Sequence, residues 1–231
     1  MTSAEDGFQF GIIQDSLANS MGAAIPNRSI GIISGEIGSG KSLITQRLAF
    51  GFVQNGVKVA YVTTELTTRG WLEQVASIGY DMDKQIDDGN FLLISSFGVI
   101  AEETEENVDL SVLLNSSGLQ DAEVIIIDRA SQLINSGTNA QLLLSQLRKF
   151  NSLGRTVLLT VDQEEIDLKL LREIKNSAEV VLDLETATVG GDTVRTIAVT
   201  RFLRAAGPTQ GRIGWKVMPQ MGFIVDITAV S

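Results

Sequence analysis

Apolar runs of strand length alternate with segments of helical periodicity along most of the chain. The predicted strands cover residues 29–34, 58–64, 90–97, 123–128 and 156–162. The predicted helices lie near residues 41–54, 67–78, 110–118, 139–152 and 164–177. The strand runs are mostly continuous in apolar character, which is typical of strands covered on both faces. The pattern therefore predicts a mainly parallel central sheet flanked by helices.

The pattern becomes β-rich after Ala178. Two runs surround Gly190, Gly191 and Asp192, and this composition is a hairpin signal. A second pair of runs surrounds a turn near residues 219–222. A parallel α/β part followed by antiparallel hairpins predicts an α/β fold of the RecA type with a β-rich C-terminal edge. We expect residues 1–231 to form a single domain.

A phosphate-binding loop is predicted between the first of these strands and its helix. The segment GEIGSGKS, residues 35–42, fits the pattern G-x-x-x-x-G-K-S. In such a loop backbone N–H groups surround the β-phosphate, Lys41 reaches the β- and γ-phosphate oxygens, and the Ser42 hydroxyl binds Mg²⁺. A structural glycine-rich turn is the alternative, which the flanking strand and helix disfavour. We predict an ATP and Mg²⁺ site whose binding residues are Glu36, Ile37, Gly38, Ser39, Gly40, Lys41, Ser42 and Leu43.

Two acidic residues at predicted strand ends are the candidate catalytic residues. Asp128 ends the run VIIID, where a carboxylate can hold the Mg²⁺ water shell opposite Ser42. The alternative for Asp128 is a cap of the following turn. Glu65 ends YVTTE, and in RecA-type NTPases a carboxylate at this strand end polarises the attacking water. The alternative for Glu65 is an acid in the first turn of the next helix, where it would stabilise the helix N-terminus.

Two further pairs of residues each leave two interpretations open. Thr160 and Asp162 end the run TVLLTVD and either sense the γ-phosphate or are ordinary polar residues at a strand end. Arg201 and Arg204 lie in the late β-rich region. In a ring they either reach a neighbour's phosphates as arginine fingers or are solvated charges on an edge strand.

Composition limits the side chains available for catalysis and the kinds of partner that we expect. The chain has no Cys and no His, so catalysis must use carboxylates, Lys, Arg, hydroxyl groups and a bound cation. The formal net charge of −10 disfavours general nucleic-acid binding. The apolar runs are shorter than the roughly 18–20 residues of a membrane helix, and no basic segment precedes the first apolar residues. We therefore expect a cytoplasmic protein.

Several longer stretches resemble a known family. Residues 15–42, DSLANSMGAAIPNRSIGIISGEIGSGKS, resemble the opening of KaiC-like members of the RecA-type P-loop ATPases. YVTTELTTRGWLEQV at 61–75, ETATVGGDTVRTIAVTRFLRAAG at 185–207 and VMPQMGFIVDITAVS at 217–231 resemble one branch, FlaH (ArlH) of the archaellum motor. The positions that match the family's nucleotide site are Gly38, Gly40, Lys41, Ser42, Glu65 and Asp128.

The resemblance implies a RecA/KaiC fold that binds ATP and hydrolyses it weakly or not at all. It also implies a homo-oligomer, with a hexameric ring as the expected form, at the inner face of the cell membrane within the archaellum motor. The implied partners are the assembly ATPase FlaI, the membrane platform and cytoplasmic scaffold proteins. A KaiC-like ATPase or autokinase is the first alternative, and a RecA-type DNA-binding recombinase paralogue is the second.

The sequence departs from the family pattern at several positions. Ala23 and Ala24 stand where glycines often precede Ile-Pro. Arg129 follows the Walker B aspartate in place of a small hydroxyl residue, and we expect it to crowd the γ-phosphate or to pair with Asp128. TVDQ, residues 160–163, replaces a strand end that often carries histidine. Leu66 follows Glu65, whereas the circadian kinase branch has two adjacent glutamates, so an autokinase is disfavoured.

Overall fold

The computed structural model describes residues 7–96, 109–134, 137–189 and 191–226. Nine strands of these residues form one sheet in the order β11-β10-β9-β8-β3-β7-β6-β4-β5. Their bounds are β3 Ile30–Gly35, β4 Val59–Thr63, β5 Phe91–Ser95, β6 Val124–Asp128, β7 Thr156–Asp162, β8 Val180–Val189, β9 Asp192–Phe202, β10 Arg212–Met218 and β11 Gly222–Val225. Two short strands, β1 (Phe8–Gln9) and β2 (Ala24–Ile25), form a separate antiparallel pair.

The sheet has a parallel part and an antiparallel part, as the sequence predicts. Strand β3 pairs in parallel with β7 and β8, and β4 pairs in parallel with β5 and β6. The last strands, from β8 to β11, pair with their sequence neighbours in antiparallel fashion. Both predicted hairpins are thus confirmed. They continue the central sheet beyond β3, so the C-terminal region lies beside the strand that leads into the P-loop.

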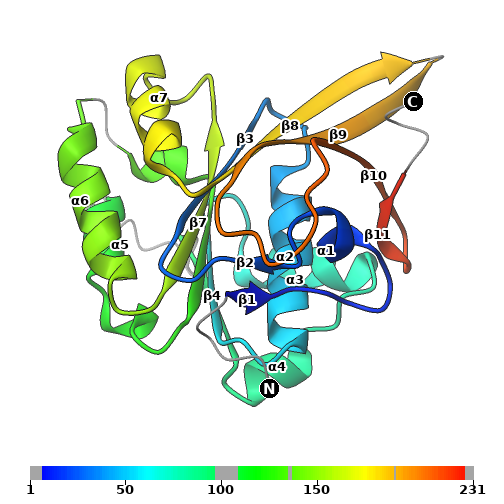
Figure 1. The fold of residues 1–231 in the computed structure, drawn as a ribbon. Helices are drawn as coiled ribbons and strands as arrows, with labels where there is room; N and C mark the ends of the chain where they lie inside the picture. Colours follow the sequence, from blue (N-terminus) through cyan, green and yellow to red (C-terminus); the bar gives the residue numbers. More distant parts are fainter. Residues whose placement is uncertain (1–6, 97–108, 135–136, 190, 227–231) are drawn as a thin grey trace.

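Helices cover both faces of the sheet (Figure 1). One face carries α2 (Lys41–Gln54) and α3 (Thr68–Ser77), and the other carries α5 (Leu110–Leu114), α6 (Ala140–Asn151) and α7 (Leu168–Ser177). Side chains alternate between the two faces along each strand. Ile33 and Tyr61 therefore belong to one core, whereas the adjacent Ile32 and Val62 belong to the other. Because each strand contributes side chains to both cores, consecutive residues are apolar, and these strands do not alternate between apolar and polar residues.

The helices depart from the sequence prediction at several ends. Helix α7 begins at Leu168 and not near residue 164, because the Asp167 side chain accepts hydrogen bonds from the backbone N–H groups of Lys169 and Leu170. The helix predicted near 110–118 is divided into α5 and the short 3₁₀ helix η1 (Ser117–Leu119). Short elements without a long apolar pattern escaped prediction: α1 Leu17–Ser20, α4 Asp83–Asp87 and the 3₁₀ helix η2 Ala130–Leu133. Within the described ranges no helix is both long enough and apolar enough to cross a membrane.

Candidate functional site

A cleft of about 300 Å³ lies where the P-loop meets the carboxyl ends of β4, β6 and β7. Parallel strands bring their carboxyl ends to one edge of the sheet, and ligand sites of open α/β sheets lie there. The residues that line the cleft are Ile37, Gly38, Gly40, Lys41, Ser42, Leu43, Glu65, Asp128, Arg129, Thr160 and Asp162. The structure thus brings together most of the predicted site residues. The exceptions are Glu36, whose side chain is exposed, and Ser39, which is buried beneath the loop beside Gly35.

The P-loop has a backbone that glycine permits. Gly38 and Gly40 have φ angles of 80° and 92°, in the left-handed region that costs other residues energy. Gly40 is also the N-cap of α2, and a Cβ atom there would lie 2.4 Å from Cη2 of Trp215 on β10. A side chain at position 40 is therefore excluded twice, by the backbone angle and by the indole. The C-terminal hairpin thus supports the loop directly.

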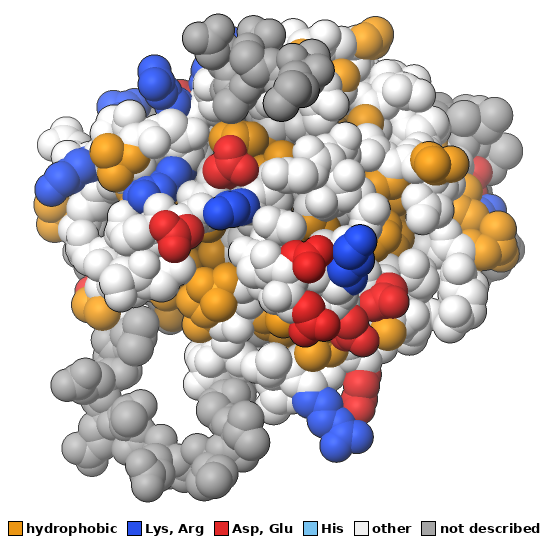
Figure 2. All heavy atoms as spheres, turned by 90° about the horizontal axis from the view of Figure 1, so that it is seen from below, with side chains coloured by type: hydrophobic (Ala, Val, Ile, Leu, Met, Phe, Trp, Pro, Cys, Tyr) orange, Lys and Arg blue, Asp and Glu red, His pale blue; other side chains and the backbone are white. Residues whose placement is uncertain are grey.

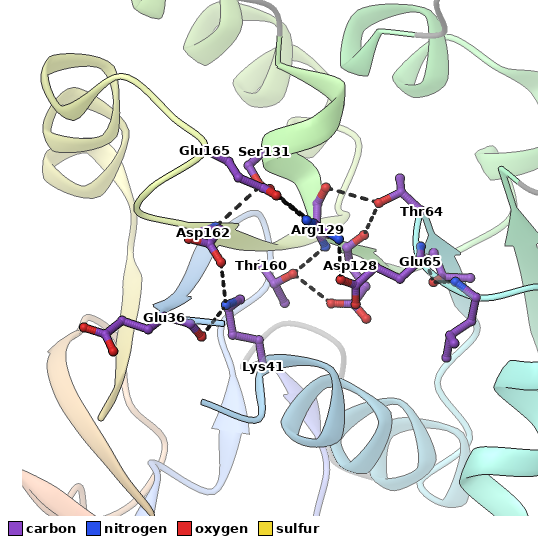
Figure 3. A network of polar contacts seen from close by, with 12 residues as sticks. Glu36, Lys41, Thr64, Glu65, Asp128, Arg129, Ser131, Thr160, Asp162 and Glu165 are labelled. Atoms are coloured by element: carbon purple, nitrogen blue, oxygen red, sulfur yellow. Dashed lines mark hydrogen bonds and ion pairs between the residues drawn. The ribbon is translucent and has the colours of Figure 1, made fainter. Parts of the chain in front are cut away.

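The Lys41 ammonium points toward the loop backbone at Glu36 and toward Asp162 (Figure 3). Its Nζ atom donates to the carbonyl oxygens of Gly35 at 2.7 Å and Glu36 at 2.8 Å. It also forms an ion pair with Asp162 at 3.4 Å between Nζ and Oδ2. These oxygen contacts hold a positive charge at the place where the P-loop motif predicts phosphate oxygens.

Asp128 at the end of β6 is a buried carboxyl group in a network of hydroxyl groups. Thr160 donates to its Oδ1 at 2.8 Å and Tyr61 donates to its Oδ2 at 3.0 Å. The Ser42 hydroxyl lies near this carboxyl and acts on its pKa in the same direction as the other two hydroxyl groups. Burial raises the pKa of Asp128, and the hydroxyl donors lower it by a smaller amount. Among the described residues no Lys or Arg pairs with Asp128, so its ionised form lacks a cation.

A divalent cation beside Asp128 and Ser42 fits this arrangement, because it would offset the burial of the carboxylate. Within the described part of the chain, no cluster of three or more acidic side chains forms a cage for a metal ion. Magnesium commonly binds through one or two protein oxygens together with phosphate oxygens and water. The donor set therefore suits Mg²⁺ that arrives with a nucleotide.

Glu65 lies just beyond β4, before helix α3 begins. Helix α3 starts at Thr68, its N-cap is Thr67, and its first turn contains no acidic residue. The alternative in which Glu65 is a first-turn acid of this helix is therefore wrong. Its carboxylate instead lines the cleft.

Arg129 contacts two glutamates across the rim of the cleft, and not Asp128 (Figure 3). Its Nη1 donates to Glu65 Oε1 at 2.6 Å, and its Nε donates to Glu165 Oε1 at 3.0 Å. The expected pairing of Arg129 with Asp128 is wrong because the chain turns sharply after β6. Arg129 has φ 60° and ψ 50°, which directs its side chain across the rim toward Glu65 and Glu165.

The site also contains residues that the sequence analysis missed. Tyr61 and Thr45 form a buried hydroxyl pair at 2.8 Å next to Asp128, and Ser131 donates to Glu165 at 2.7 Å. A tyrosine in a buried strand gives a weak sequence signal because it also packs as a core residue. Glu165 was hidden because its segment was predicted as helix, whereas it precedes α7.

Thr160 and Asp162 both take part in this network. Thr160 bonds to Asp128 and accepts from the backbone N–H of Arg129, and Asp162 pairs with Lys41. Ordinary polar residues at a strand end also make such contacts, so both interpretations stay open. Their role as γ-phosphate sensors stays a prediction.

Arg201 and Arg204 have partners within the chain, away from the P-loop. Arg201 donates to the carbonyl oxygens of Lys175, Asn176 and Ala178 at the end of α7, and Arg204 donates to Asn27. In the strand register, Arg201 on β9 lies opposite Val181 on β8, and Val181 lies opposite Ile32 near the start of β3. Arg201 is therefore near the end of the sheet opposite the P-loop. For Arg201 the alternative of a solvated edge charge is wrong, because β9 lies between β8 and β10. Arg204 follows the end of β9 and is exposed, so for it a solvated charge stays open. The arginine-finger alternative concerns contacts between protomers and stays a prediction.

Comparisons with known proteins agree with this geometry. The family described as "ATPase: KaiC" matches residues 13–220. A relative named archaeal flagellar ATP-binding protein FlaH, from Methanocaldococcus jannaschii, is 32% identical over 94% of this chain and 95% of its own length. The protein of the same name from Methanococcus voltae is 29% identical over 94% and 96% of the two chains. The crystal structure of the flagellar accessory protein FlaH from Methanocaldococcus jannaschii matches with a TM-score of 0.86 and 31% identity, covering 95% of this chain and 98% of that one.

Proposed function

The chain belongs to the KaiC family of ATPases and, within it, to the archaeal flagellar ATP-binding proteins named FlaH, and from this premise we propose that it is an ATP-binding subunit of the archaellum motor. We further propose that the nucleotide acts mainly by occupying the site, with hydrolysis slow or absent. The bound nucleotide would then hold a protein shape that partner proteins recognise. The observation that carries this proposal is the cleft that combines the P-loop, Lys41, Ser42 and Asp128.

Each part of the cleft has a place in binding Mg-ATP. The N–H groups of the P-loop and the N-terminus of α2 face the phosphates. Lys41 would exchange its carbonyl partners for phosphate oxygens, and Ser42 with Asp128 would hold Mg²⁺ and its water shell. The metal supplies positive charge that offsets the charge of the phosphate oxygens. Glu65 would orient the attacking water, and its contact with Arg129 supports slow hydrolysis.

Lys41→Ala is expected to weaken ATP binding at least tenfold, or about 1.4 kcal/mol, because it removes the cation that faces the phosphates. Isothermal titration calorimetry with Mg-ATP measures the change. Lys216→Ala is the matched control, since Lys216 pairs with Asp226 at 3.1 Å and does not line the cleft. Equal affinities for Lys41→Ala and the parent protein would refute the assignment of the cleft.

We propose that the protein assembles as a homo-oligomeric ring at the inner face of the cell membrane. The partners would be the archaellum assembly ATPase, the membrane platform and cytoplasmic scaffold proteins. RecA-type nucleotide sites commonly lie between subunits, so ATP, but not ADP, is expected to promote the oligomer. Light scattering after size-exclusion chromatography tests this, together with a pull-down of the assembly ATPase with each nucleotide. An oligomeric state and a pull-down that are both indifferent to nucleotide would contradict the proposed role.

Nucleic acid is not among the partners that we propose. The formal net charge is −10, and on the face in Figure 2 Lys and Arg side chains lie interspersed with acidic and uncharged ones. Proteins that bind the nucleic-acid backbone gather basic side chains to neutralise phosphates. The charge distribution therefore disfavours a nucleic-acid partner.

A further inference from the structure

We propose that Arg129 is a positioning residue that restrains the Glu65 carboxylate and so keeps ATP hydrolysis slow. This inference rests on the proposed ATP-binding function and adds a cause for the slow turnover. It starts from one contact, the 2.6 Å hydrogen bond between Arg129 Nη1 and Glu65 Oε1 at the rim of the cleft. Both residues line that cleft, next to Asp128.

Arg129 is itself held in place from the other side. Its Nε contacts both Glu165 oxygens, at 3.0 and 3.2 Å, and its Nη2 donates to Glu165 Oε1 as well. Glu165 in turn accepts from the Ser131 hydroxyl at 2.7 Å. The guanidinium therefore spans two carboxylates, as Figure 3 shows, and Glu165 fixes the end that does not face Glu65. Only a planar, forked cation can make both contacts at once.

The backbone directs the side chain to this place. Arg129 has φ 60°, a conformation that is unfavourable for residues other than glycine and that persists only where neighbouring contacts compensate. One such contact is the hydrogen bond from its backbone N–H to Thr160 Oγ1. The same threonine donates to Asp128, so the turn that aims Arg129 is coupled to the candidate metal ligand.

The contact affects what Glu65 can do. To orient a water for attack, a carboxylate must accept a hydrogen bond from it in a defined direction. A guanidinium bonded to Oε1 occupies one acceptor position and fixes the direction of the group. The side chains of Arg129 and Glu65 are 28% and 39% exposed, so this contact is weaker than a buried ion pair. We therefore infer a restraint that slows hydrolysis and does not abolish it.

Arg129→Gln tests the restraint first without nucleotide. The glutamine keeps a polar side chain but removes the cation, so Glu65 should become more reactive toward a water-soluble carbodiimide with an amine nucleophile. We expect its labelling rate, measured by peptide mass spectrometry, to rise about threefold or more. The matched control is Arg69→Gln, which breaks an exposed Arg69–Glu73 pair with a similar 2.7 Å contact outside the cleft. This control should raise the labelling of Glu73 and leave Glu65 unchanged.

The same variants are then compared in single-turnover ATP hydrolysis. Arg129→Gln should raise the rate constant about threefold to tenfold, the range for a partly exposed charge-assisted contact. Calorimetry on each variant sets the enzyme concentration that binds all of the ATP, so that the rate constant reports hydrolysis and not binding. Arg129→Lys should give an intermediate rate, because it keeps the charge but cannot span both glutamates. Glu165→Gln, which leaves Arg129 itself intact but loosens its anchor, should also raise the rate.

Two results would overturn the restraint. One is unchanged Glu65 labelling in folded Arg129→Gln protein, as judged by its thermal melting curve. The other is a hydrolysis rate that stays constant or falls in both Arg129→Gln and Glu165→Gln while ATP still binds. Failure of the proposed function would give a different result, namely no ATP binding by the parent protein. The labelling experiment contains no nucleotide, so it tests the restraint independently of ATP binding.

Discussion

Arg47→Ala is expected to lower the free energy of unfolding by about 3–5 kcal/mol, the usual effect of breaking a buried ion pair. The side chains of Arg47 and Asp15 are both fully buried. Arg47 donates to the two Asp15 carboxylate oxygens at 2.5 and 2.8 Å, and to the Phe10 carbonyl oxygen at 2.9 Å. Alanine would leave the Asp15 carboxylate buried without a cation, and burying an unpaired charge is costly. Urea unfolding followed by circular dichroism measures the change.

Two further variants distinguish the effect of breaking a buried ion pair from the effect of merely losing an arginine. Arg69→Ala removes an arginine from an exposed pair and should leave the urea midpoint almost unchanged. The double variant Arg47→Met with Asp15→Leu replaces both charges by apolar groups and should recover much of the lost stability. A loss for Arg47→Ala as small as that for Arg69→Ala would contradict the prediction.

The Arg47 pair also joins the N-terminal segment to the nucleotide site. Arg47 lies on α2, the helix that begins at Lys41, whereas Phe10 and Asp15 precede the P-loop strand. The close approach is visible at Gly51, where a Cβ atom would lie 2.3 Å from the Phe10 carbonyl oxygen. The N-terminal segment therefore packs against the helix that carries the phosphate-binding lysine. Loss of Arg47 should loosen that helix as well as the segment.

The sequence predicted those parts of the site that depend on the order of strands, loops and helices along the chain. A P-loop must follow a strand and start a helix, and β3 and α2 do end and begin on either side of it. Asp128 and Glu65 were found because each lies at or just after the end of a predicted strand, and the ends of parallel strands meet at one edge. These inferences need the element type and the strand direction, which hydrophobic patterning supplies.

The sequence could not predict contacts that depend on a side chain's direction. Pairing with Asp128, its neighbour in sequence, was one of two expectations for Arg129, the other being that it crowds the γ-phosphate. The positive φ angle instead directs the side chain to Glu65 and Glu165. Arg201 has no acidic neighbour in sequence, yet backbone carbonyls at the end of α7 accept its hydrogen bonds. Backbone acceptors are present at every residue, so sequence patterns do not reveal which of them an arginine will meet.

Glu65→Gln is expected to reduce hydrolysis by roughly 10²–10⁴, the usual contribution of a positioned general base. The amide keeps the size of the side chain but cannot take a proton from water. ATP affinity should stay within about twofold of the parent, because Glu65 lies on the rim of the cleft opposite the P-loop backbone and the Lys41 ammonium. Arg129 should keep its place, since its contacts with Glu165 do not involve Glu65.

Phosphate release under single-turnover conditions, with calorimetry for affinity, measures both quantities. Glu73→Gln is the control, because it neutralises a glutamate in an exposed Arg pair outside the cleft. The effect should be larger still when Glu65→Gln is added to Arg129→Gln, since the rate then falls from a higher starting value. If hydrolysis survives Glu65→Gln in both backgrounds, water activation must come from another group, and Asp162 is the next candidate because its carboxylate also lines the cleft. Such a result would leave Glu65 as a partner for Arg129 and no more.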